Sequence, residues 1–380
     1  MMAIDTATLD AWADDLGGPV ALHLRQKLLP IEGEGGVFFP PTYAHGDKES
    51  PYAIDTLSNG TKIVQVDSVG SQANRMEPLF RKARDGEAAN PLASLVPQVE
   101  IDLGNGTIVN ILDAGHRLGD AIVRSSDLHK DAQDAFVQYQ KTGDAAAIAR
   151  LAPTTLVFGA WDSRDTQAKL PRVVQAVIRA WDVDPIKRSA QYNPPADYIK
   201  LDVFTEEERA KAEGNTTSPL ARQGFVHVPA VGTPGGVIAR GGIFRDVTVN
   251  LIALRQIGSG PAQELRRYVL GLALIAACEP QDGFLRQGCL LTLDPDAPAQ
   301  WETVERSGKR THVAMDASVL QTYARAAATA FGIGPDRPAK FLKDRAKADV
   351  KKGDPKKGKA KNDATKADVT QDDATEAGTE

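Results

Sequence analysis

The chain has 380 residues, 42% of them hydrophobic and 25% charged, which is typical of a globular protein that buries a core. No apolar run reaches the roughly 18 residues that a membrane-spanning helix requires. The net charge is −5, from 45 Lys and Arg against 50 Asp and Glu, which argues against a surface coated in positive charge for non-specific nucleic-acid binding. An average charge still allows a local basic groove.

The N-terminal stretch contains Asp5, Asp10 and Asp14 but no basic segment, so it does not resemble a secretory signal. Cys278 and Cys289 are the only cysteines and form no CxxC pair. We therefore expect reduced core thiols and a cytoplasmic protein. The six histidines are scattered along the chain, which argues against a structural zinc site.

The first predicted unit is a β-branched strand at Thr61–Val66, followed by a helix from about Ser71 to Ala83. The second is a strand at Thr154–Trp161. Its continuation, Leu170–Val183, is predicted as a helix because Val173, Val177 and Trp181 recur every four residues.

The third unit begins with a strand in Asp246–Ile257, where Val247, Val249 and Leu251 alternate with polar residues. Pro261–Glu279 is predicted as a helix, because Pro261 suits a first turn and a broad apolar face follows it. Gln287–Leu293 is predicted as another strand. Strands alternating with helices of ordinary length indicate an α+β or α/β fold.

Long irregular segments separate these units at Gly33–Pro51, Arg84–Pro97 and Asn193–Gly236, and we interpret them as insertions projecting from a core sheet. Ala346–Glu380 contains eight lysines and eight acidic residues with almost no apolar side chains. Such a composition is typical of a disordered, solvated tail. The sequence thus predicts a folded unit at residues 1–345 and a charged tail at 346–380.

Common catalytic and cofactor motifs do not fit this sequence. The turn after Thr61–Val66 lacks the G-x-S-x-G pattern of a nucleophile elbow. The glycine-rich segment Gly232–Arg245 leads into a strand and lacks both the P-loop and the dinucleotide-binding spacing. It is interpreted either as a tight turn or as a close backbone approach to a ligand.

Polar and basic residues instead gather at predicted element ends. Cations there can neutralise phosphates, and scattered aromatic rings can stack on bases, as in proteins that grip a nucleic-acid backbone. This set consists of Gln72, Asn74, Arg75, His116, Arg117, Arg124, Trp161, Ser163, Arg164, Arg240, Arg245 and Arg255.

Several longer motifs, taken in order, resemble one family, the backbone RAMP subunit (Cas-seven type, Csb family) of the type I-G, formerly I-U, CRISPR Cascade complex. The resemblance spans nearly all of residues 20–295. The motifs are Phe38–Ala44, Val66–Pro78, Ala114–Arg124, Leu156–Ser163, Gly235–Arg255, Leu265–Ala277 and Leu285–Leu291.

This resemblance implies a modified RRM-like (ferredoxin-like) palm with large inserted finger and thumb segments. It implies several copies along one crRNA, leaving the bases free to pair with target DNA in antiviral defence. The implied partners are crRNA, target DNA, further copies of the chain, and the other Cascade subunits, namely Cas-five- and Cas-six-like proteins and a large subunit. It implies no nuclease activity and no cofactor, and the residues themselves predict no metal site and no membrane association.

Carried onto this sequence, the resemblance assigns RNA contacts to individual residues. Arg75, Arg117, Arg124, Arg240 and Arg245 would neutralise crRNA phosphates, although a surface or intersubunit salt bridge is an equal alternative for each. The other predicted contacts come from Ser71, Gln72 and Asn74 near a helix N-terminus, from His116, Ser163 and Arg164, and from the backbone at Gly241 and Gly242. Phe158 and Trp161 are expected in the core.

Two other functions stay open at this stage. One is a metal-dependent ribonuclease of type III-like character, for which Asp113 is the best candidate. The other is a small-molecule binder that uses the Gly232–Arg245 segment.

Overall fold

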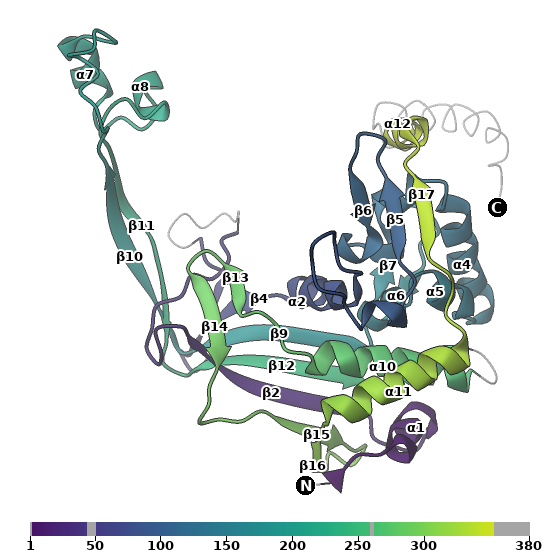
Figure 1. Cartoon of the computed structure of the whole chain (residues 1–380). Coiled ribbons are helices and arrows are strands. Elements are labelled where there is room, and N and C mark those ends of the chain that lie inside the picture. The colour runs from purple at the N-terminus through teal and green to yellow at the C-terminus, as the bar shows by residue number, and fades with distance from the viewer. Residues whose placement is uncertain (1, 44–50, 259–261, 353–380) are drawn as a thin grey trace, which may run out of the picture.

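The computed structural model describes residues 2–43, 51–258 and 262–352 (Figure 1). Its centre is a ten-stranded sheet, in which four strands form an antiparallel core in the order β2, β12, β9, β4. These strands are β2 (Ala21–Pro30), β4 (Lys62–Asp67), β9 (Val174–Trp181) and β12 (Ile243–Asn250).

The outer edge of β2 is shared by two later strands. β15 pairs with Ala21–Arg25 and β14 with Leu28–Pro30, both antiparallel. Shorter strands extend the sheet beyond them. The remaining strands of this sheet are β1 (Met2–Ala3), β3 (Ile54–Thr56), β13 (Phe284–Arg286), β14 (Cys289–Leu293), β15 (Gln300–Val304) and β16 (Arg310–Ala314).

Helices cover one face of the sheet (Figure 1). Along β12 every second residue, from Ile243 to Val249, is buried, and Val247 and Val249 share a core cluster with these helices. The longest of these helices, α10, has eleven buried residues and packs against α11. The layer contains α1 (Thr6–Asp14), α2 (Val69–Met76), α9 (Leu251–Arg255), α10 (Gln263–Cys278) and α11 (Ala317–Phe331).

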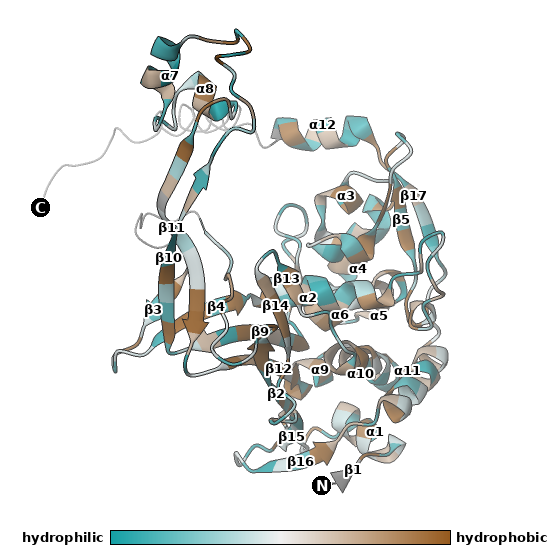
Figure 2. Cartoon of the chain, turned by 60° about the vertical axis from the view of Figure 1, so that its left-hand side comes forward, coloured by the Kyte–Doolittle hydropathy of each residue, from teal (hydrophilic) through white to brown (hydrophobic). Residues whose placement is uncertain are grey.

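A mixed module is formed by chain between β4 and β9 together with the C-terminal β17 and α12, and it packs beside α2 and α10 (Figure 2). It contains a three-stranded sheet in the order β17, β5, β6 and a two-stranded sheet of β7 and β8. Its strands are β5 (Val99–Asp102), β6 (Ile108–Asn110), β7 (Ala160–Trp161), β8 (Lys169–Leu170) and β17 (Arg337–Lys340). Its helices are η1 (Glu77–Phe80), η2 (Ala93–Leu95), η3 (Ile111–Asp113), η4 (Arg117–Gly119), α3 (Ala121–Arg124), α4 (His129–Thr142), α5 (Ala146–Leu151), α6 (Thr154–Phe158) and α12 (Lys343–Lys352).

A two-stranded ribbon projects from the sheet and ends in a small helical module (Figure 1). β10 (Val183–Tyr192) and β11 (Val228–Ala239) pair along its length. We call residues 193–227 the tip module. It carries α7 (Glu206–Ala212) and α8 (Pro219–Arg222) around the buried side chains of Ala212, Ala221 and Val226.

The α+β class is confirmed, because helices segregate to one face of an antiparallel sheet. The predicted strand at Thr61–Val66, the helix after it, the strand before Ile257 and the helix before Glu279 also form, with shifted ends. The strand in Gln287–Leu293 is confirmed as well. Both cysteines are free.

The second predicted unit was wrong in both halves. Thr154–Phe158 is helix α6, and the predicted helix at Leu170–Val183 contains strand β9. The four-residue spacing of Val173, Val177 and Trp181 misled the prediction, because four is also a multiple of the two-residue period of a strand. The β-branched residues of this segment favour a strand.

The predicted irregular segment Asn193–Gly236 projects from the sheet as expected, but it is not irregular throughout. Its end belongs to β11, as does most of the glycine-rich stretch before Arg240. The predicted tail boundary at residue 346 falls inside α12, and residues 353–380 of that tail lie outside the described residues, as do residues 44–50 of Gly33–Pro51. None of the described helices is long and apolar enough to cross a membrane.

Candidate nucleic-acid interface

The predicted site residues divide among four places in the fold. Four of them belong to a hydrogen-bonded network at the end of β4, and four line an open cleft beside α2. Two lie at a groove near α12, and three lie at the base of the ribbon. In that order the groups are Ser71, Gln72, Arg75 and Arg245; Asn74, His116, Arg117 and Ser163; Arg124 and Arg164; Arg240, Gly241 and Gly242.

The network at the end of β4 centres on Asp67, whose side chain is 1% exposed. The Asp67 carboxylate accepts hydrogen bonds from Ser71 Oγ at 2.7 Å, Gln72 Nε2 at 2.7 Å and Arg75 Nε at 3.0 Å. Arg286 Nη2 adds a contact of 3.3 Å. We call these residues, with Arg245, the Asp67 network. Helix α2 begins directly after Ser68, because the Ser68 side chain accepts a hydrogen bond from the Ser71 N–H.

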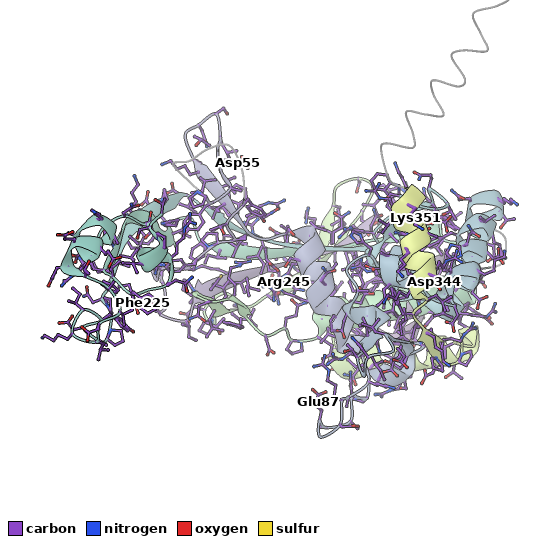
Figure 3. The ribbon with its side chains drawn as sticks, turned by 90° about the horizontal axis from the view of Figure 1, so that it is seen from above. Asp55, Glu87, Phe225, Arg245, Asp344 and Lys351 are labelled. Atoms are coloured by element: carbon purple, nitrogen blue, oxygen red, sulfur yellow. The ribbon has the colours of Figure 1, made fainter. Side chains whose placement is uncertain are left out.

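Arg245 extends this network across the sheet. Its Nε donates to Gln72 Oε1 at 2.9 Å and its Nη1 to Gln26 Oε1 at 2.8 Å. Burial lowers the pKa of Arg245 to about 10. The resulting polar row separates two apolar clusters on the same sheet face, one containing Val247 and the other Ile243. Figure 3 shows Arg245 near the middle of the molecule.

Arg75 and Arg286 also donate to backbone carbonyls of their own chain. Arg75 Nη2 donates to the carbonyl of Leu285 at 2.7 Å, and Arg286 Nη2 to that of Val66 at 2.8 Å. The residues of the Asp67 network thus hold β4, α2 and β13 together. Their predicted contacts with crRNA stay predictions.

The cleft has a volume of about 610 Å³ and opens between α2, η4 and β7. Asn74 and His116 are exposed at it, and Ser163 is half-buried. No acidic residue is among those that line it. The lining residues are Gly70, Asn74, Gly115, His116, Arg117, Gly159, Ala160, Trp161, Ser163, Leu170 and Arg172.

Arg117 forms the floor of the cleft and is only 4% exposed. Its φ is 54°, a backbone conformation that is uncommon for a residue other than glycine. Its Nε lies 2.7 Å from Glu77 Oε2, and its Nη1 donates to the carbonyl of Gly159 at 3.2 Å. Nη2 of Arg117 and Oε1 of Glu77 are buried without a hydrogen-bond partner among the described residues.

Glu77 lies behind Arg117 and is itself 1% exposed. Burial raises the pKa of Glu77 to about 7, outweighing the attraction of Arg117, which acts in the opposite direction. Near neutral pH the pair therefore carries more positive charge than a fully ionised pair would. This charge lies directly beneath the cleft.

Trp161 and Arg172 also line the cleft, and Lys169 lies beside Trp161. The Trp161 side chain is 56% exposed, and Lys169 Nζ lies 4.8 Å from the centre of its ring. Arg172 Nη1 donates to the carbonyl of Val69 at 3.3 Å, and burial, with a smaller contribution from Arg117, lowers the pKa of Arg172. The expectation that Trp161 packs in the core was wrong. Phe158 is fully buried, as predicted.

This arrangement is suited to one type of ligand. An exposed indole ring offers a surface on which a nucleic-acid base can stack, and cations without a lining carboxylate attract phosphate. Amide, imidazole and hydroxyl groups at the rim can bond sugar or phosphate oxygens.

Arg124 and Arg164 lie at a different place, a groove of about 1140 Å³ between α3, α4 and α12. Arg124 Nη1 donates to the carbonyl of Gly119 at 3.0 Å, while Arg164 is exposed. They share this groove with Arg345, whose Nη2 contacts His129 Nδ1.

The residues at the base of the ribbon contact their own chain. Arg240 Nε donates to Asp184 Oδ2 at 2.6 Å across the ribbon. A Cβ at Gly241 would lie 3.0 Å from the Trp181 carbonyl, and Gly242 has a φ of 87°. The close approach expected at these glycines is thus made to Trp181, which fits the alternative of a tight turn before a strand. Their contact with RNA stays a prediction.

Sequence reasoning missed the residues that decide which arginines are internal. Asp67 pairs with Arg286 and Glu77 with Arg117, both distant in sequence. Arg172 lies inside the segment Leu170–Val183 that was predicted as a helix, and Lys169 directly precedes that segment.

Asp113, the candidate for metal-dependent cleavage, forms an ion pair with Arg81 Nη1 at 3.1 Å. Over residues 2–43, 51–258 and 262–352, no group of three or more His, Cys, Asp and Glu side chains is arranged to hold a metal ion. The ribonuclease alternative itself stays a prediction.

Comparison with known protein families gives one match. Residues 22–185 match the model of a family described as CRISPR-associated protein GSU0053. The matched stretch contains every residue that lines the cleft. No curated protein sequence matches the chain.

Among solved structures, the chain is similar to one described as "CRISPR RNA-guided surveillance complex, pre-nicking". The alignment covers 80% of each chain with 12% sequence identity and a TM-score of 0.35. A TM-score of that size does not establish a shared fold.

Proposed function

We propose that the chain is a non-catalytic, crRNA-binding backbone subunit of a type I-G CRISPR surveillance complex. The observation that carries this proposal is the cleft, where three separate sequence segments meet to place an exposed tryptophan among cations. The match of residues 22–185 to a CRISPR-associated family supports it.

Strand order supports the RRM-like palm. Setting aside β4, which precedes α2 and pairs with the outer edge of β9, and the ribbon and short α9, the elements run β2, α2, β9, β12, α10 and then β14 and β15 along the chain. In the sheet the last of these strands flank β2, which neighbours β12, which neighbours β9. This β-α-β-β-α-β succession, with the fourth strand beside the first and the third between the first and second, is the ferredoxin-like arrangement.

In this proposal the cleft holds the RNA backbone without reading its sequence. A base stacks on Trp161, and Arg172 in the lining and Lys169 beside the ring neutralise neighbouring phosphates. Arg117 contributes charge from beneath, and Asn74 and Ser163 bond sugar or phosphate oxygens. Stacking and phosphate contacts tolerate any base, as a subunit that must hold many different spacers requires.

Several copies then assemble along one crRNA together with the other Cascade subunits, and the free bases pair with target DNA. The projecting ribbon supplies the thumb-like insertion of such a subunit (Figure 1). The subunit needs no cofactor and acts in the cytoplasm.

The test is to co-express the full chain with a crRNA and the other complex subunits, and to extract the bound nucleic acid. We expect protected RNA of defined length in a multi-copy complex. The double variant Trp161→Ala/Arg172→Ala should lose the RNA, whereas Tyr192→Ala, which removes an exposed aromatic ring from the ribbon, should keep it. A wild-type protein that stays monomeric and carries no RNA would overturn the proposal.

A further inference from the structure

The tip module is a structured unit, although it lies far from the main core. The Tyr198 and Phe225 rings pack edge to face with centres 4.9 Å apart. Helix α7 begins with a complete capping box, in which Thr205 and Glu208 bond one another's backbone N–H groups. Such local stabilisation keeps the module's surface in a fixed arrangement that a partner can recognise.

The charge of this module does not suit RNA. Between Asn193 and His227 six acidic residues face four Lys and Arg, and three consecutive glutamates, Glu206, Glu207 and Glu208, occupy the first turn of α7. Phosphate would be repelled here. Leu201 and Val203, just before these glutamates, are 62% and 51% exposed. An apolar segment beside acidic residues fits a basic protein surface.

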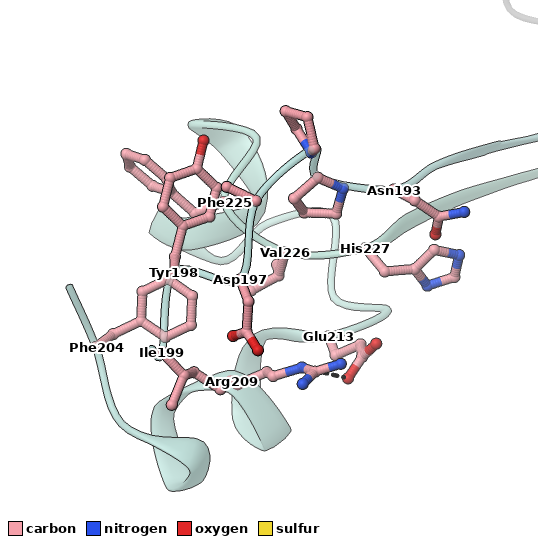
Figure 4. A pocket seen from close by; sticks show the side chains of 13 residues that line it. Asn193, Asp197, Tyr198, Ile199, Phe204, Arg209, Glu213, Phe225, Val226 and His227 are labelled. Carbon is pink, nitrogen blue, oxygen red and sulfur yellow. Dashed lines mark ion pairs between the residues drawn. The ribbon is translucent and has the colours of Figure 1, made fainter. Parts of the chain in front are cut away.

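A pocket of about 610 Å³ opens in the same module (Figure 4). Tyr198, Phe204 and Phe225 supply aromatic surface. The carboxylates of Asp197 and Glu213 also line the pocket, where they form surface ion pairs with Lys200 and Arg209 that a partner's lysine would have to exchange. Aromatic rings with nearby carboxylates bind the methylene chain and ammonium group of a lysine.

Helix α12 has the complementary character. Lys343, Lys347 and Lys351 recur every four residues and so form one stripe, all exposed. Val350, beside this stripe, is 76% exposed. Between Lys343 and Lys352 five basic residues face two acidic ones. The helix therefore presents a lysine stripe with an exposed apolar side chain beside it.

These two surfaces do not meet within one copy. Figure 3 places Phe225 of the tip module and Lys351 of α12 at opposite ends of the molecule, and Figures 1 and 2 also show α7 and α12 apart. A contact between them requires two copies. Such a contact joins different surfaces, so it can repeat from copy to copy into an open chain.

We propose that the tip module of one copy docks on the lysine stripe of α12 in the next copy. This inference rests on the proposed function, because it identifies the surfaces through which neighbouring copies contact one another along the crRNA. The contact joins a small module to one helix, so it is weak alone and gains strength when neighbouring copies share one RNA.

The test uses the full chain without RNA, as an equal mixture of isotope-labelled and unlabelled protein. Carbodiimide, which couples carboxylates to amines in direct contact, should link Glu206–Glu208 of one copy to Lys343, Lys347 or Lys351 of another. Sedimentation should show that Glu206→Lys/Glu207→Lys and Lys343→Glu/Lys347→Glu each weaken self-association about tenfold or more. A variant that carries all four changes should self-associate with an affinity within about threefold of the wild type.

Matched controls are Asp85→Lys and Lys309→Glu, which reverse exposed charges elsewhere and should leave self-association unchanged. Intermolecular links confined to other surfaces, self-association unaffected by either reversal, or a combined variant that stays dissociated would each overturn the inference. So would a loss of affinity for an RNA long enough for one copy only, because that would make α12 an RNA contact.

Failure of this inference is distinguishable from failure of the proposed function. A protein whose tip module and α12 cross-link as expected but that binds no RNA contradicts only the crRNA-binding role. A protein that binds crRNA through the cleft but assembles without these links contradicts only the docking contact.

Discussion

The Asp67 network and the cleft lie on either side of α2 and are both rich in arginine, yet they differ in how their charges are satisfied. In the network, Arg75 and Arg286 share the buried Asp67 carboxylate and donate further to backbone carbonyls. In the cleft, Arg117 keeps a buried Nη2 without a partner among the described residues. Arginine content alone therefore does not identify a binding surface.

What separates the two regions is the placement of acidic residues. Asp67 lies at the centre of its network, whereas Glu77 lies behind Arg117 and leaves the cleft lining free of carboxylates. A phosphate approaching the cleft meets cations without first displacing a carboxylate from the cleft lining. This difference predicts that mutations in the network change folding, and that mutations in the cleft change RNA affinity.

The largest effect is expected from Asp67→Ala. It leaves two arginines and Gln72 without their shared acceptor, and removing one partner of a buried ion pair destabilises by about 3–5 kcal/mol. Urea unfolding measures the loss. Asp113→Ala is the control, since its partly exposed pair with Arg81 should contribute no more than about 1 kcal/mol. Equal losses in the two variants would contradict the central role of Asp67.

Trp161→Ala should have the next largest effect, on RNA affinity instead of stability. The ring is exposed, so its removal opens no core cavity, and losing one base–aromatic stack weakens binding by about 1–3 kcal/mol. Fluorescence anisotropy with a short single-stranded RNA measures this change, with Tyr192→Ala as the control. Unchanged affinity in Trp161→Ala would remove the cleft as the interface.

Local signals explain what the sequence could predict of these two regions. The strand and helix around Asp67 were predicted because β-branched residues precede a run of small polar ones, and α10 because its apolar face is long. The residues that satisfy Asp67 were not predictable, since Arg286 lies 219 positions away.

The cleft was predicted only in part for a similar reason. Asn74, His116, Arg117 and Ser163 were selected separately, but their meeting depends on packing between distant segments. Trp161 was assigned to the core because large aromatic residues are usually well buried. Its exposure arises because β7 is a two-residue strand at the rim of its module, a feature that no local pattern shows.

Glu77 offers a test of the charge beneath the cleft. Its pKa is about 7 in the folded chain and ordinarily 4.5, so the folded state holds a proton that the unfolded state releases in this range. Stability from this group therefore falls as the pH rises from 4.5 to about 7. Glu77→Gln removes the titration.

Urea unfolding of wild type and Glu77→Gln at pH 5 and pH 8 checks this sign. The variant should gain stability relative to wild type as the pH rises, because only the wild type loses its buried proton. The other titrating groups are common to both proteins and cancel in the comparison. A stability difference that stays constant with pH would show that Glu77 is ionised throughout, held by Arg117.

The smallest expected effect is on the salt dependence of RNA affinity, and it distinguishes the arginines of the cleft from those of the Asp67 network. Log affinity for single-stranded RNA falls linearly with log salt, and each lost phosphate contact reduces the slope by about 0.7–1. Arg172→Ala, in the cleft, should reduce the slope by that amount. Arg75→Ala should leave the slope unchanged in the folded protein and instead lower the urea midpoint, because its guanidinium is bound to Asp67 and Leu285. A reduced slope in Arg75→Ala would mean that Arg75 exchanges Asp67 for phosphate when RNA binds, and the Asp67 network would then belong to the interface as well.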